Sequence, residues 1–269
     1  MKAELFPFQK KALSQLRLMA GEAINGYQRT HSNQVVSFTA PKGAGKTIII
    51  ASLIEDIFCG TVDYPEQPNA IFIWLSDSPQ LNEQSKLKID LKADKIKIGQ
   101  CVTINEESFN QEILDDGHIY FLNTQKLGKS SNLTKRSDAR QYTIWETLAN
   151  TARDKSDHLY VIIDEAHSST SGEDLKAVKK ALNLGVDVED MEDAVTENMR
   201  QTGRQANVAM FAFTATPKPK TLETFGVQTP DGKFAAFHTY SMKQACNEGY
   251  ILDVFQAYIE YQTYYRVRK

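Results

Sequence analysis

The stretch from Ala40 to Thr47 reads APKGAGKT and joins two segments of different character. The run Val35–Thr39 before it is apolar and β-branched, as in a buried strand, whereas Thr47–Phe58 after it is a long apolar run typical of a helix. A glycine-rich turn that links a strand to a helix and ends in Gly-Lys-Thr matches the relaxed phosphate-loop pattern, with Ala40 in place of the first glycine. The stretch therefore predicts a nucleotide-phosphate site. The alternative is a glycine-rich turn without a ligand, which the flanking segments disfavour.

Each position of this loop has a chemical role. Gly43 and Gly45 let the backbone direct its N–H groups at phosphate oxygens, and the following helix presents its positive end to them. Lys46 places a charge on the β- and γ-phosphates, and the Thr47 hydroxyl is a ligand for Mg²⁺. The residues expected to contact the nucleotide are Ala40, Pro41, Lys42, Gly43, Ala44, Gly45, Lys46 and Thr47.

Two adjacent carboxylates follow another apolar run, Val161–Ile163. In a parallel sheet, ligands bind outside the carboxyl ends of the strands, so this strand end is expected to lie beside the phosphate loop. Asp164 would then hold Mg²⁺, and Glu165 would orient and deprotonate the attacking water. The alternative is that both acids only cap the next segment, and the phosphate loop upstream disfavours it.

Short apolar runs alternate with helix-like segments along most of the chain. The runs are apolar on successive residues, as expected for strands buried on both faces, and comprise Gln34–Thr39, Ala70–Leu75, Cys101–Ile104, His118–Leu122, Leu159–Ile163 and Val208–Phe213. The helical segments are Pro7 to about Gln28, Lys46–Phe58, Gln80 to about Leu91 and Tyr142–Arg153. This alternation predicts an α/β fold with a mostly parallel central sheet flanked by helices.

The composition narrows the class of protein. The chain has 269 residues, with 31 Lys and Arg against 34 Asp and Glu, so any nucleic-acid contact must come from a local patch. None of its apolar runs approaches the roughly 18 residues that span a bilayer, and no secretory leader is recognisable. Its three cysteines are far apart, which argues against a disulfide framework or a zinc cluster. We expect a cytoplasmic protein without a membrane partner.

The order of three motifs resembles a known superfamily. A phosphate loop, then Asp-Glu-Ala-His at residues 164–167, then Phe-Thr-Ala-Thr-Pro at residues 213–217 is similar to the DEAD/DEAH-type superfamily-two helicases and translocases. The resemblance implies a RecA-like ATPase domain that uses ATP and Mg²⁺ and acts on nucleic acid. Phe6-Pro7-Phe8-Gln9 is similar to the motif that reads adenine, with Gln9 as the amide that binds the adenine edge.

The same resemblance implies further site residues. Two stretches, at residues 75–84 and 121–127, are similar to the first and second nucleic-acid-contacting loops of the superfamily. They contribute Ser78, Pro79, Gln84 and Thr124. Residues that would relay the state of the γ-phosphate to the nucleic acid are His167, Thr214 and Thr216.

Three further stretches, less specific than these motifs, are similar to the R (Res) motor subunit of restriction–modification enzymes within that superfamily. They are Phe-Thr-Ala-Pro at 38–41, Thr-Ala-Thr-Pro-Lys at 214–218 and Tyr-Ser-Met-Lys-Gln-Ala at 240–245, followed by Glu-Gly-Tyr-Ile-Leu-Asp at 248–253. This branch implies movement on duplex DNA and a separate modification or specificity subunit. A repair or RNA helicase of the same superfamily remains an alternative, as does a nucleotide-binding switch or scaffold without motor activity.

The domain organisation expected from these motifs is one RecA-like domain over residues 1–255, with an acidic helical insertion at about 172–207. Residues 256–269 would be a linker to a second RecA-like domain, so the chain is expected to be a fragment. Because that second domain would carry the arginine fingers, we expect weak nucleotide binding and slow hydrolysis by the fragment alone. Lys42 departs from the small or hydroxyl residue that is usual in the superfamily.

Overall fold

A computed structural model describes residues 2, 4–30, 35–40, 43–62, 64–76, 78–123, 131–164, 208–214, 227–228, 230–235 and 238–250. Its α-helices are α1 (Pro7–Thr30), α2 (Lys46–Cys59), α3 (Pro79–Lys92), α4 (Ile144–Asp154) and α8 (Met242–Asn247), with short 3-10 turns at Asn132–Thr134 and Ser156–His158. Its strands are β1 (Val35–Thr39), β2 (Ile71–Ser76), β3 (Cys101–Thr103), β4 (Ile119–Asn123), β5 (Leu159–Asp164), β6 (Val208–Thr214), β7 (Val227–Gln228), β8 (Phe234–Ala235) and β9 (His238–Thr239).

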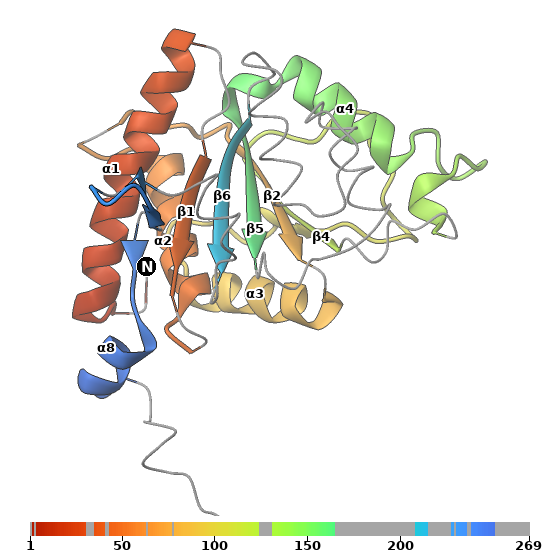
Figure 1. The fold of residues 1–269 in the computed structure, drawn as a ribbon. Helices are drawn as coiled ribbons and strands as arrows, with labels where there is room; N and C mark the ends of the chain where they lie inside the picture. Colours follow the sequence, from red (N-terminus) through yellow and green to blue (C-terminus); the bar gives the residue numbers. More distant parts are fainter. Residues whose placement is uncertain are drawn as a thin grey trace, which may run out of the picture.

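A seven-stranded sheet forms the centre of the molecule, in the order β3-β4-β2-β5-β6-β1-β9 (Figure 1). Every pairing within it is parallel, which confirms the expected α/β class with a mostly parallel sheet flanked by helices. Strands β7 and β8 form a separate antiparallel pair. Because all strands of the main sheet point the same way, their carboxyl ends lie along one edge, where ligands bind in folds of this kind.

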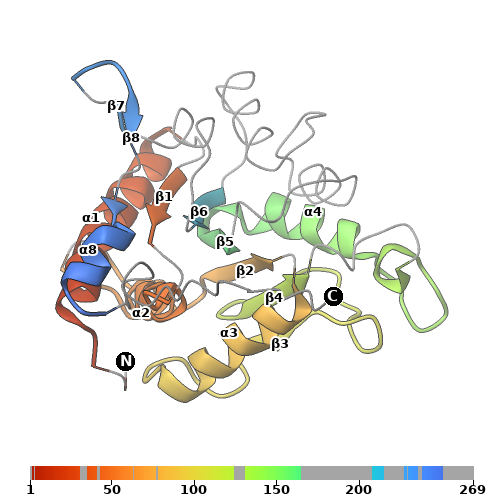
Figure 2. The same cartoon turned by 60° about the horizontal axis from the view of Figure 1, so that its bottom comes forward.

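Both faces of the sheet are covered, and the side chains of each strand alternate between two cores. In β2, Phe72 and Trp74 pack with α1, α2 and α3, whereas Ile71, Ile73 and Leu75 pack with α4. Figure 2 shows α2 and α3 on one side of β2 and β4, with α4 on the other. Burial on both faces explains why these strands are apolar at successive positions rather than at every second one.

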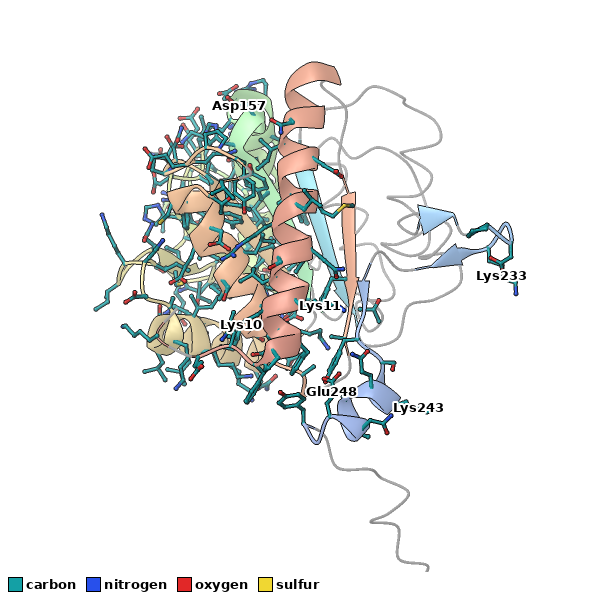
Figure 3. All side chains as sticks on the ribbon, turned by 90° about the vertical axis from the view of Figure 1, so that its left-hand side faces the viewer. Lys10, Lys11, Asp157, Lys233, Lys243 and Glu248 are labelled. Atoms are coloured by element: carbon teal, nitrogen blue, oxygen red, sulfur yellow. The ribbon has the colours of Figure 1, made fainter. Side chains whose placement is uncertain are left out.

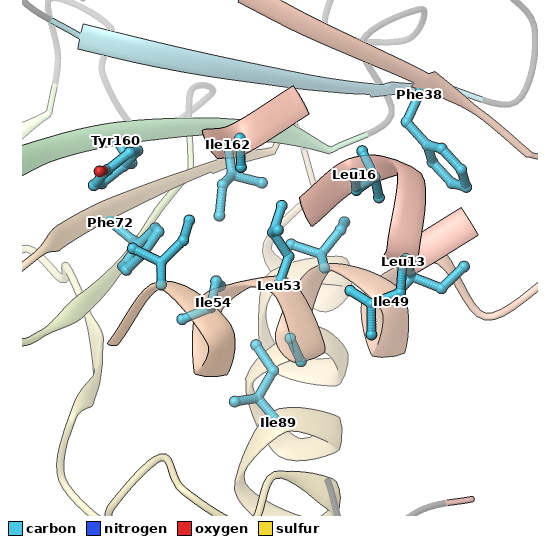
Figure 4. Close-up of a cluster of buried hydrophobic side chains, with 14 of the residues drawn as sticks. Leu13, Leu16, Phe38, Ile49, Leu53, Ile54, Phe72, Ile89, Tyr160 and Ile162 are labelled. Carbon is cyan, nitrogen blue, oxygen red and sulfur yellow. The ribbon is translucent and has the colours of Figure 1, made fainter. Parts of the chain in front are cut away.

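Helix α2, which follows the phosphate loop, is wedged into the larger core. Ile49, Ile50 and Ile57 are fully buried, and Leu53 packs between the sheet and α1 (Figure 4). Its polar residues are also tied down: the Glu55 carboxylate, 3% exposed, accepts the N–H groups of Asp94 and Lys95 at 2.5 and 2.8 Å. The helix that presents the loop is therefore fixed along its length.

Helix α4 begins with a complete capping box on the opposite face of the sheet. The Thr143 hydroxyl accepts the N–H of Glu146 at 3.3 Å, and the Glu146 carboxylate accepts the N–H of Thr143 at 2.9 Å. Arg136 also donates to this carboxylate through its Nε and Nη2 atoms. The pKa of Glu146 is lowered to about 2, first by the bond from Arg136 and then by the bonds from Thr143.

This lowered pKa predicts an acid-sensitive contribution to folding. Glu146 stabilises the folded state fully above its unfolded pKa of 4.5 and loses that contribution as the pH falls toward about 2. We expect Glu146→Gln to lower the free energy of unfolding by about 1 kcal/mol or less near neutral pH, because the ion pair is solvent-screened. Urea unfolding at pH 6 and pH 2.5 measures the difference, which should shrink at the lower pH. A gap between wild type and Glu146→Gln that does not change with pH would contradict this assignment.

The elements expected from the sequence match the observed ones, with ends that differ by one or two residues. Strand β9, the β7–β8 pair and helix α8 were not expected. The expected insertion at 172–207 and the linker at 256–269 lie outside the described residues. None of the helices in the described ranges is long and apolar enough to cross a membrane.

Candidate nucleotide-binding site

The three strands that carry the expected catalytic motifs lie side by side. Strand β6 lies between β1 and β5, with Phe213 paired to Phe38 on one side and to Asp164 on the other. Two strand spacings separate Phe38 from Asp164, a distance of about 10 Å between their backbones. The end of β1, which leads into the phosphate loop, and the end of β5, which carries the acid, therefore face the same region beyond the sheet edge.

The described part of the loop has the backbone shape that its glycines allow. Gly43 and Gly45 have φ angles of +90° and +78°, a region that residues with a side chain rarely adopt. A Cβ atom at Gly45 would lie 2.5 Å from Gln9 Nε2, so the close approach of Gln9 also requires glycine there. Helix α2 starts at Lys46, immediately after Gly45, and directs the N–H groups of its first turn toward the loop.

Lys46 holds its charge inside the loop. Its side chain is only 7% exposed, and its Nζ atom donates to the carbonyl oxygen of Ala40 at 3.2 Å. A buried ammonium group at the positive end of a helix is a favourable environment for an anion with several oxygens, such as a phosphate chain. The donors present therefore fit a nucleotide phosphate.

Two residues with oxygen ligands suited to Mg²⁺ belong to elements that end or begin at this edge of the sheet. Thr47 is half-buried in the first turn of α2, and Asp164 is 6% exposed at the end of β5. A hydroxyl and a carboxylate are ligands that Mg²⁺ accepts alongside substrate phosphates. The Thr39 hydroxyl at the end of β1 is buried and has no hydrogen-bond partner among the described residues. Thr39 was not among the residues expected to bind the nucleotide or Mg²⁺.

Gln9 contacts the phosphate loop directly. It is 6% exposed, its Nε2 atom donates to the Ala44 carbonyl oxygen at 3.0 Å, and its Oε1 atom accepts the N–H of Phe6 at 3.0 Å. A side-chain amide has two N–H donors and two acceptor sites, so each group retains one more position. Gln9 thus joins the start of α1 to the loop, a contact that the sequence did not indicate.

The two expected nucleic-acid loops leave neighbouring strands. Ser76 at the end of β2 pairs with Asn123 at the end of β4, so the segments after these residues start side by side. Ser78 is the N-cap of α3 and accepts the N–H of Leu81 at 3.4 Å; Pro79 is the first residue of that helix, and Gln84 is exposed on it. Ser78 therefore has a structural role in addition to the expected one.

Several expected site residues lie outside the described residues. They are Pro41, Lys42, Thr124, Glu165, His167 and Thr216. The backbone of Thr214 is described, and it ends β6 opposite Thr39 of β1. Asp164 and the described loop residues are brought to one sheet edge, and Thr214 lies between them on the intervening strand.

A strand, a glycine-rich loop and a buried helix at the edge of an all-parallel sheet define this unit as a RecA-like P-loop domain. The family described as type III restriction enzyme, res subunit, matches residues 2–219. The chain therefore belongs to that family, whose members carry a superfamily-two helicase-like ATPase domain and are related to the motor subunits of restriction enzymes.

Solved structures of other proteins match this chain, and one of them is a restriction–modification enzyme. The structure of a nuclease-deletion mutant of the Type ISP restriction–modification enzyme LlaGI, in complex with a DNA substrate mimic, matches with a TM-score of 0.42 and 12% sequence identity. The match covers 94% of this chain and 22% of LlaGI, so this chain spans about a fifth of the length of that enzyme. No curated protein matches.

Proposed function

We propose that the chain is the ATP-binding motor domain of a DNA-dependent ATPase that moves along duplex DNA, as the restriction subunit of a restriction–modification system. One observation carries this proposal: the buried ammonium group of Lys46 lies within a glycine-rich loop at the sheet edge that also holds Asp164. Membership of the res-subunit family supports the restriction branch.

The described and expected residues divide the chemistry between them. The loop and Lys46 hold the β- and γ-phosphates, while Thr47 and Asp164 are the residues that would hold Mg²⁺, which neutralises phosphate charge when bound. Glu165 takes a proton from water as the water oxygen bonds to the γ-phosphorus. The bond from that phosphorus to the β–γ bridging oxygen breaks, and ADP leaves.

Hydrolysis must then be coupled to movement. Thr214, Thr216 and His167 would relay the loss of the γ-phosphate toward the segments after β2 and β4, where Ser78, Pro79, Gln84 and Thr124 would contact duplex DNA. A second RecA-like domain, joined through residues 256–269 to the domain at 1–255, would supply the arginine fingers and the moving partner. A modification or specificity subunit would supply the recognition of a DNA sequence.

The test is ATP hydrolysis with and without duplex DNA. The 269-residue chain alone should hydrolyse ATP slowly, because arginine fingers contribute about 10³- to 10⁵-fold in related sites. The intact protein should be stimulated by duplex DNA, and DNA binding should weaken as salt rises.

Other outcomes would point to other functions. Rapid DNA-stimulated turnover by the isolated chain would contradict the role given to the second domain. Nucleotide binding with no response to DNA would instead favour a switch or scaffold, and preferential stimulation by RNA would favour an RNA helicase.

A further inference from the structure

Two segments at the edge where the strands end are joined to each other by side chains. Segment 104–117 follows β3, and segment 131–143 is the described chain that resumes after β4 and precedes α4. Strands β3 and β4 are parallel neighbours, with Thr103 opposite Phe121, so both end at this edge, where the second expected nucleic-acid loop also starts. Neither segment contains an α-helix, so their shape depends on contacts between them.

Arg140 makes the central contacts. It is 6% exposed, its Nε atom donates to the Phe109 carbonyl oxygen at 2.9 Å, and its Nη2 atom donates to that of Glu106 at 2.5 Å. Its Nη1 atom donates to the carbonyl oxygen of Asn132, on the other segment. No carboxylate in the described ranges forms an ion pair with it. Because the guanidinium is a rigid planar fork, it fixes the three carbonyl groups relative to one another.

Ser131 makes a second link to the same residue of the first segment. Its hydroxyl donates to the Glu106 carboxylate at 2.9 Å and accepts the N–H of Leu133 at 3.1 Å. Ser131 is 6% exposed and Leu133 is fully buried. Glu106 is therefore held by Arg140 through its carbonyl group and by Ser131 through its carboxylate. We call Glu106, Ser131 and Arg140 the Arg140 clamp.

The clamp holds the point to which the chain returns after the second expected nucleic-acid loop. Asn123, 5% exposed at the end of β4, is the last described residue before that loop, and Ser131 is the first one after it. Both flanks of the stretch that carries Thr124 are thus fixed by buried residues. A segment with fixed ends loses less conformational entropy when it binds a partner, so this arrangement favours affinity.

The clamp is far from the nucleotide site. In the order of the sheet, β2, β5 and β6 lie between β4 and β1, the strand that leads into the phosphate loop. Four strand spacings separate β4 from β1, which is roughly 19 Å. A change in the clamp should therefore affect nucleic-acid binding and leave ATP binding as it is.

We propose that Arg140 is a positioning residue for the contact with duplex DNA. Through Glu106 and Ser131 it holds the chain after the second nucleic-acid loop in the conformation that binds. The inference rests on the proposed motor function. It concerns a residue that lies in none of the motifs that indicated the superfamily.

The intact protein tests this role by two measurements, anisotropy of a labelled DNA duplex and ATP hydrolysis at increasing duplex concentration. Arg140→Met keeps most of the side-chain length but removes every donor. It should raise the dissociation constant for the duplex, and the duplex concentration that gives half-maximal stimulation, by about 5- to 30-fold, as for one or two lost hydrogen bonds. The KM for ATP and the rate at saturating duplex should stay at wild-type values. Arg140→Lys should resemble Arg140→Met, because an ammonium cannot reproduce the fork.

Thr151→Val is the matched structural control. Thr151 is fully buried on α4, and its hydroxyl accepts the N–H of Leu114 at 2.9 Å, so it also holds segment 104–117. This contact lies near the end of α4, at the other edge of the sheet. Figure 3 shows Asp157, in the turn after α4, at the opposite end of the molecule from Glu248, which follows β9. Thr151→Val should lower the unfolding temperature and leave the response to DNA unchanged.

Ser131→Ala is a milder variant that decides the matter if Arg140→Met does not fold. It should weaken DNA binding in the same direction. Because both residues act through Glu106, the effects of Ser131→Ala and Arg140→Met should be less than additive in the double variant. Wild-type DNA affinity in the folded variants, or an equal loss in Thr151→Val, would overturn the proposal. A wild type that neither binds nor responds to duplex DNA would overturn the proposed function, and this inference with it.

Discussion

Replacement of Lys46 by alanine is expected to lower the affinity for Mg-ATP by roughly 30- to several thousand-fold, equivalent to about 2–5 kcal/mol. The side chain is 7% exposed and its ammonium lies in the loop beside the Ala40 carbonyl, so water replaces it poorly. Calorimetric titration of the wild type and the variant measures the loss. Lys88→Ala removes the same charge from an exposed position on α3 and should leave the affinity unchanged.

Lys46→Arg sharpens this test. It keeps the charge but lengthens the side chain and replaces a compact ammonium with a planar fork. Because Lys46 is only 7% exposed and its ammonium is held by the Ala40 carbonyl, we expect the arginine variant to bind ATP nearly as poorly as the alanine variant. Wild-type affinity in Lys46→Ala would show that the loop does not hold the phosphates.

Replacement of Glu165 by glutamine is expected to reduce ATP turnover by about 10²- to 10⁴-fold while ATP affinity stays within a few-fold of wild type. Glutamine conserves size but cannot take a proton from the attacking water. Phosphate release by the intact protein at saturating ATP and duplex DNA measures the rate, and titration measures binding. Glu83→Gln, an exposed position on α3, is the control. Turnover that persists in Glu165→Gln would require another base.

The parts of the fold that the sequence predicted are those governed by local pattern. Strand β2 is buried at all six positions, so its unbroken apolar run was a reliable signal, and α2 showed both a glycine-rich start and a long apolar run. Strand β9 has two residues, His238 and Thr239, and exists because it pairs with Phe38 and Thr39. The two strands are 200 residues apart in the sequence, and a strand of two residues is too short to show an alternation of polar and apolar side chains. Strand β9 therefore could not be predicted from the sequence.

The site was predictable to a similar degree. The parallel sheet brings the phosphate loop and Asp164 to one edge, as the position of both motifs after apolar runs indicated. The contact between Gln9 and Ala44 spans 35 residues, and the stack of Phe8 on Tyr240 joins the two ends of the described chain. These contacts depend on how α1 packs, and no motif encodes that.

The parallel topology also determines when, during synthesis, the phosphate loop can be completed. Strand β1 at residues 35–39 has two neighbours, β6 at 208–214 and β9 at 238–239, and both emerge from the ribosome long after it. Strands β2, β4 and β5 emerge earlier and pair with one another first. The segment that holds the loop therefore waits for about 170 residues of further translation, so the phosphate loop can be completed only after β2, β4 and β5 have emerged.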